Sequence, residues 1–165
     1  MLVPFRRFHL DAVATPEIVV ERLRKEVRPK PGLDEYSRVM WKSAKPEGPV
    51  FIGKIEGYTF RIQQVVRGRN SFIPLIWGRI EPTQSGTRID VTMFMHPFVF
   101  AFTLFWLGAV GYALWMNPWV PDLIMFVFGL TLSVGGFYWE AAKAKRLLSR
   151  AVVSSAESSH QQQSP

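Results

Sequence analysis

The chain of 165 residues contains no cysteine, and no familiar catalytic motif can be found in it. Without cysteine, disulfide bonds and thiolate chemistry are excluded, and the composition fits a reducing compartment. The motifs GxGxxG, GxxxxGK[ST] and GxSxG are absent as well. The sequence therefore gives no local support for nucleotide binding or for a nucleophile-elbow hydrolase.

The N-terminal segment also lacks the apolar stretch of a cleaved signal peptide. Arg6, Arg7, His9 and Asp11 interrupt it, whereas such a peptide needs an unbroken apolar region of about 7 to 15 residues. We expect the whole chain to be mature protein.

Charge is almost missing from two apolar runs, Phe98 to Met116 and Leu123 to Trp139, whose connector holds the single charged residue, Asp122. A Lys or Arg at the bilayer centre costs roughly 2.5 to 3.5 kcal/mol on insertion scales. About 20 helical residues cross the hydrocarbon layer. The sequence predicts a transmembrane hairpin over residues 97–140, with spans at 98–116 and 119–139.

Small residues in both runs favour close packing of two antiparallel helices. They are Gly108, Ala109, Gly111 and Ala113 in the first run, and Gly129, Ser133, Gly135 and Gly136 in the second. Packing within one chain is the preferred interpretation, and dimerisation with a second copy is the alternative. We expect Trp106 to pack against lipid or against the second helix.

The distribution of positive charge predicts the orientation of the hairpin. Lys and Arg flank both spans, while the connector has none, which is the positive-inside pattern with both termini in the cytoplasm. The flanking cations are Arg79 and Arg88 on one side, and Lys143, Lys145, Arg146 and Arg150 on the other. We expect a bacterial inner-membrane protein with two spans.

Residues 1–96 predict an α+β fold, namely an antiparallel β-meander with one N-terminal helix. Alternating apolar residues and short turns indicate strands at 2–10, 50–55, 58–66, 71–81 and 87–95. Thr15, Pro16 and Glu17 are typical of a helix start, and this helix should run to about Val27. Pro74 lacks an N–H donor and predicts an irregularity or a free edge in its strand. The pattern over 32–48 is irregular.

An ordered set of short motifs runs through this β-rich region. It comprises Phe51-x-Gly53, Phe60-x-Ile62, Arg69-Asn70-Ser71-Phe72-x-Pro74, Gly78-x-Ile80 and Gly86-Thr87-x-Ile89. The set resembles a family of small uncharacterised bacterial membrane proteins in which a β-rich cytoplasmic segment precedes a two-helix transmembrane hairpin. The resemblance covers roughly residues 50–140 and implies location and architecture, without an activity. The glycines also suit turns and close strand crossings.

Residues suited to metal binding or acid–base catalysis are scattered. His9, His96 and His160 lack the close i, i+4 spacing of a helical metal site. Asp34 and Glu35 fall in the irregular segment, and Glu56 and Glu81 lie beside turns. We therefore predict no catalytic residue, no metal ligand and no cofactor.

Basic residues are the candidates for binding. Arg67, Arg69 and Asn70 form one turn with donors for a phosphate, although a solvated hairpin tip is the preferred interpretation. Residues 141–153 should form a basic juxtamembrane helix whose cations contact anionic lipid headgroups while its apolar residues lie in the membrane surface. Its cations are Lys143, Lys145, Arg146 and Arg150, and its apolar residues include Leu147, Leu148, Ala151 and Val152. Residues 154–165 should be a disordered tail.

Two functions of different classes follow from these observations. The first is a non-enzymatic, membrane-anchored interaction module that binds a partner protein, another copy of itself or anionic lipid headgroups. The second is a membrane-bound enzyme or small-molecule binder with a pocket between sheet and helix. Nucleic acid is the less favoured partner, because membrane topology already accounts for the basic charge.

Overall fold

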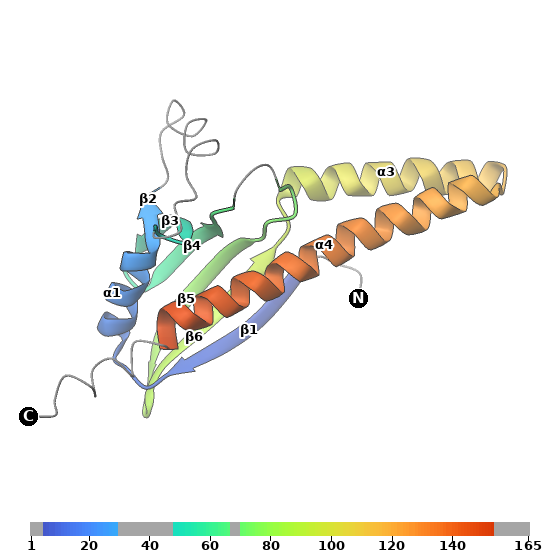
Figure 1. Ribbon diagram of the computed structural model, residues 1–165. Coiled ribbons are helices and arrows are strands. Elements are labelled where there is room, and N and C mark those ends of the chain that lie inside the picture. Colours follow the sequence, from blue (N-terminus) through green and yellow to red (C-terminus); the bar gives the residue numbers. More distant parts are fainter. Residues whose placement is uncertain (1–4, 30–47, 67–69, 154–165) are drawn as a thin grey trace, which may run out of the picture.

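The computed structural model of the chain describes residues 5–29, 48–66 and 70–153. Its fold is α+β, as predicted, with two long apolar helices after the sheet (Figure 1). In chain order the elements are β1 (Phe5–Ala12), α1 (Pro16–Glu26), β2 (Val27–Pro29), β3 (Phe51–Glu56), β4 (Thr59–Gln64), β5 (Leu75–Thr83), β6 (Gly86–Phe94), α3 (Pro97–Met116) and α4 (Val120–Val153). The predicted irregular segment 32–48 falls almost entirely outside the described residues, and the predicted tail 154–165 falls outside them completely.

The six-stranded sheet has the order β1-β6-β5-β4-β3-β2. Strands β3 to β6 form the predicted antiparallel meander. The sequence did not indicate that β1 pairs with the whole of β6, from Phe5 opposite Phe94 to Ala12 opposite Thr87. It also gave no sign of β2, which runs parallel to β3 at the other edge. The sheet is therefore mostly, and not entirely, antiparallel.

Pro74 limits one strand, but it does not lie within that strand, contrary to the prediction. Strand β5 begins at Leu75, immediately after the proline, and not at Ser71 as the alternation suggested. The missing N–H of Pro74 thus costs no hydrogen bond of the sheet.

One face of the sheet forms the core, because α1 and the second half of α4 lie across it (Figure 1). Helix α1 contributes Val19, Val20 and Leu23, whereas Ile18 is 44% exposed. The strands contribute alternate residues, including Phe51, Phe60, Ile62, Ile76, Ile80, Ile89, Val91 and Met93. The opposite face of the sheet, called the open face below, carries no helix of the described residues.

A side-chain hydrogen bond ties α1 to the β3–β4 turn. The Tyr58 hydroxyl donates to Glu17 Oε1 at 2.7 Å. This bond lowers the pKa of Glu17 from its ordinary value, and the nearby carboxylate raises the pKa of Tyr58. The bond therefore stabilises the folded domain above the ordinary pKa of a glutamate, and its contribution declines as pH falls through the lowered value.

Candidate functional site

Helix α4 packs against α3 in its first half and against the sheet in its second half, and it has no break between the two. It runs from Val120 to Val153 as one helix, so the predicted juxtamembrane helix at 141–153 is a continuation of the second apolar helix. In this half the fully buried side chains are Phe137, Ala141, Ala144, Leu148 and Val152, which face the sheet. The expectation that Leu148 and Val152 lie in the membrane surface is therefore wrong, because both are buried in the protein core.

The other half of α4 and most of α3 project from the sheet as an antiparallel pair, while Val99 and Phe100 at the start of α3 pack against the core (Figure 1). Both helices are long and apolar enough to cross a membrane, which fits a membrane protein. No residue of α3 is buried, and Phe105 is 72% exposed and Trp115 85%. A core helix of a soluble domain would hide such side chains, since each large apolar group gains about 1.5 to 3 kcal/mol on leaving water.

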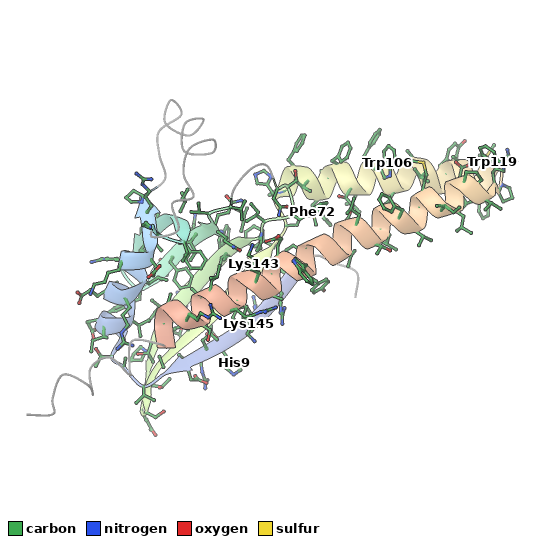
Figure 2. The ribbon with its side chains drawn as sticks, viewed as in Figure 1. His9, Phe72, Trp106, Trp119, Lys143 and Lys145 are labelled. Carbon is green, nitrogen blue, oxygen red and sulfur yellow. The ribbon has the colours of Figure 1, made fainter. Side chains whose placement is uncertain are left out.

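The two apolar helices contact each other at small residues. A Cβ atom on Gly129 would lie 3.2 Å from Trp106 Nε1, and one on Gly111 would lie 3.5 Å from the Phe126 ring. Trp106 therefore packs against the second helix, while Trp119 lies at the tip of the hairpin (Figure 2). The predicted small-residue set is used only in part, because a Cβ atom on Gly108 or Gly135 would meet no other described atom within 4 Å.

A hollow with basic walls lies between the start of β1 and the second half of α4. We call it the basic hollow, and its volume is about 490 Å³. It is lined by Arg6, Ala142, Lys145, Arg146, Ser149 and Arg150. Three of the four predicted α4 cations therefore meet at one place, while the fourth, Lys143, is exposed outside it (Figure 2). Arg6 and Ser149 were not anticipated from the sequence.

The predicted anion contact at Asn70 has another role. Its Nδ2 donates to Glu140 Oε1 at 3.0 Å, and its Oδ1 accepts from the Phe72 backbone N–H at 3.0 Å. These bonds hold the β4–β5 connection against α4, where Phe72 also packs on Gly136. An anion near Asn70 would face the Glu140 carboxylate, so the geometry argues against this contact. Arg67 and Arg69 lie outside the described residues.

The open face of the sheet has a second hollow, of about 520 Å³, with mixed charge. The Arg61 guanidinium lies 4.8 Å from the centre of the Trp77 ring, and that ring meets Phe94 edge-on. Acidic residues accompany the cations here, since Arg79 pairs with Glu81 at 3.6 Å and Asp90 also lines the hollow. This balance gives the open face no preference for an anion.

The described histidines do not gather into a metal site. His9 lies on β1, and His96 occupies the N-cap of α3, where its Nδ1 accepts from the Phe98 backbone N–H at 3.3 Å. Among residues 5–29, 48–66 and 70–153, no group of three or more metal-ligating side chains occurs. His160 lies outside these ranges.

Comparisons with known proteins identify no relative of established function. No family model matches the chain, and no curated protein matches it. Among solved structures, protein NE0264 from Nitrosomonas europaea is similar at a TM-score of 0.32 and 13% identity, over 58% of this chain and 77% of that one. A likeness this distant identifies no family.

Proposed function

We propose that the protein is a non-enzymatic interaction module of the bacterial inner membrane, anchored by the α3–α4 hairpin with both termini in the cytoplasm. Its α+β domain would contact anionic lipid headgroups. The observation that carries the proposal is the continuity of α4, which holds the apolar span and the sheet-packed basic segment in one helix. Because such a helix has no joint, it would hold the domain at a fixed height on the membrane.

The charges beside the span support contact with an anionic surface. Lys143, Arg146 and Arg150 are exposed and follow the second apolar run, whereas the connector has no cation. Each cation close to an anionic membrane contributes about 1 kcal/mol of attraction. Three of them would contribute about 3 kcal/mol at low salt by the same rule.

The sheet–helix interface supports a module over the alternative of an enzyme or small-molecule binder with a pocket there. Phe137, Ala141, Ala144 and Leu148 have no exposed surface, so apolar side chains fill the part of the interface that they form with the sheet, and the basic hollow is lined by other residues of α4. A partner protein or a second copy of the chain is the other class of partner that such a module would bind. For a partner protein or a second copy, no surface of the described residues is as specific a candidate for contact as the basic segment of α4 is for lipid headgroups.

Neutralising the exposed cations tests the lipid contact. In nanodiscs, adding phosphatidylglycerol to a zwitterionic lipid should increase the hydrogen-exchange protection of α4 and β1 in the natural protein. We expect the triple variant Lys143→Gln, Arg146→Gln, Arg150→Gln to lose most of this increase. The gain in the natural protein should also shrink in 1 M salt, where the screening length is about 3 Å.

The matched control removes three exposed cations from other elements of the domain, α1 and β2. Arg24, Lys25 and Arg28 are exposed on α1 and β2, so Arg24→Gln, Lys25→Gln, Arg28→Gln should keep the response to phosphatidylglycerol. An equal loss in both triple variants, or no response in the natural protein, would count against specific contact by the α4 cations.

A further inference from the structure

We infer that the basic hollow between β1 and α4 binds one phosphate group. The α4 cations Lys145, Arg146 and Arg150 would bind it together with Arg6 and the Ser149 hydroxyl. The inference rests on the proposed function and deepens it, since it assigns the anion contact to one built site and not to a diffuse charged surface.

All the charged residues that line the basic hollow are positive. The lining contains Arg6, Lys145, Arg146 and Arg150 together with the Ser149 hydroxyl, and no acidic residue. Within the described part of the chain, none of these four cations forms an ion pair. The open face differs, because acids accompany its cations. Four converging positive charges repel one another, and a bound anion would relieve that repulsion.

The fold aims these side chains into one place. Alternation along β1 puts Arg6 on the same side as Phe8 and Leu10, which pack against the core. The Lys145 ammonium lies 4.8 Å from the centre of the Phe8 ring, so the strand positions a cation that belongs to the helix. Ala142, Arg146 and Ser149 follow one another on one side of α4, at spacings of four and three residues.

Two independent measures place Lys145 and Arg6, but not Arg150, near the hydrocarbon layer, since Arg150 is eleven residues or about 16 Å beyond Trp139 along the helix. Lys145 is six residues beyond Trp139, which corresponds to about 9 Å along a helix. Arg6 pairs with Met93, four residues before the start of α3, which is at most about 14 Å of extended chain. The headgroup layer is about 5 to 7 Å thick on each side of the bilayer, so the long side chains of Lys145 and Arg6 can reach it.

The donor set suits the oxygens of a phosphate group. Arginine guanidinium groups bind phosphate oxygens in pairs, and a lysine ammonium and a hydroxyl add single donors. The volume of about 490 Å³ falls within the range of roughly 300 to 1,000 Å³ typical of small-ligand sites. A lipid headgroup and free inorganic phosphate share this chemistry, so the experiment must separate the two sources.

The test measures the reactivity of Lys145 towards an amine-acylating reagent by mass spectrometry, with exposed Lys25 on α1 as the internal reference. The full-length protein is held in maltoside micelles, which contain no phosphate. One sample has no addition, a second contains inorganic phosphate, and a third contains phosphatidylglycerol. We expect acylation of Lys145 relative to Lys25 to fall at least fivefold in the third sample. A similar fall in the second would show that phosphate alone suffices.

Arg6 and its neighbour Arg7 provide a matched pair of variants. Both changes remove one charge from the same strand at the same height, but Arg7 lines the open face. Arg6→Gln should abolish the protection of Lys145, whereas Arg7→Gln should preserve it. Unprotected Lys145 in both phosphate-containing samples would overturn the inference.

Equal protection of Lys143 and Lys145, unaffected by either variant, would also overturn the inference while leaving the proposed contact with an anionic surface intact. The α4 triple variant gives a further check, since Arg146 and Arg150 line the same hollow as Arg6 and Lys145. If that variant lost its response to phosphatidylglycerol but still showed Arg6-dependent protection of Lys145, the two α4 arginines would not be needed to bind the phosphate. That result would assign the phosphate to Arg6 and Lys145 alone and would contradict the four-cation site.

Discussion

Truncating Leu148 to alanine is expected to cost about 2 to 5 kcal/mol of stability, the usual range for a large-to-small change in a packed core. Leu148 has no exposed surface and lies where the second half of α4 crosses the sheet. The loss should appear as faster hydrogen exchange of the amides of α4 beyond Trp139, and of β1 and β6, in protein held in nanodiscs.

The control for this variant is the same change on the other half of the same helix. Leu132 is 50% exposed on the apolar hairpin, so Leu132→Ala leaves no cavity in the protein core. We expect its effect on sheet amides to stay below about 0.5 kcal/mol, the size usual for substitutions outside the core. Similar effects of the two variants would contradict the packing of α4 on the sheet.

Gly53→Ala is expected to destabilise the α+β domain by about 3 kcal/mol or more, at or beyond the upper end of the usual cost of overpacking. Gly53 on β3 faces Ile62 on β4, and an added Cβ atom would lie 2.7 Å from the Ile62 Cα and closer still to the Arg61 carbonyl oxygen. Backbone atoms cannot rotate away as a side chain can. For a domain of this size, the loss corresponds to a fall of about 12 to 24 °C in the thermal midpoint.

Substitutions at two other glycines serve as comparisons for the expected loss of stability in Gly53→Ala. Gly78 lies against the Phe60 ring, which is itself buried in the core, so Gly78→Ala should also be strongly destabilising. Gly57 has φ of 55° in an open turn, and asparagine tolerates that conformation. Gly57→Asn should therefore melt close to the natural protein. A Gly53→Ala variant that melts within a few degrees of Gly57→Asn would show that β3 and β4 are not held so closely.

Local patterns in the sequence were sufficient for the meander, α1 and the two apolar helices, because alternation, turn residues and uninterrupted apolar length act over short distances. The pairing of β1 with β6 joins residues such as Phe5 and Phe94, which are far apart in the chain and share no local signal. Strand β2 was missed because Arg28 and Pro29 follow the helix and are typical of a helix end.

The second half of α4 was misjudged for a physical reason. Leu148 and Val152 among basic residues fit a helix on a membrane surface as well as one on a sheet. The distinguishing signal was the stripe that begins at Phe137 and continues through Ala141 and Ala144 at helical spacing across the end of the span. Alanine counts for little in hydropathy, although its small side chain lets the helix approach the strands closely.

The basic hollow was only half predictable for a related reason. Lys145, Arg146 and Arg150 are neighbours on one helix and were identified as anion contacts. Arg6 joins them because β1, the first strand, lies beside the last helix (Figure 1). Asn70 was assigned to the same role on its turn chemistry, but its amide is bound to Glu140, which a pattern of neighbouring residues does not reveal.

The most direct test of the whole account is the orientation of the hairpin, and a chain without cysteine is suited to it. Asn117→Cys places one thiol in the α3–α4 connector, and Ser85→Cys places one in the exposed β5–β6 turn. A membrane-impermeant maleimide should label Asn117→Cys in intact spheroplasts and should label Ser85→Cys only after the membrane is opened. Labelling of Ser85→Cys in intact spheroplasts, or protection of Asn117→Cys there, would contradict a cytoplasmic domain anchored by two membrane-crossing helices.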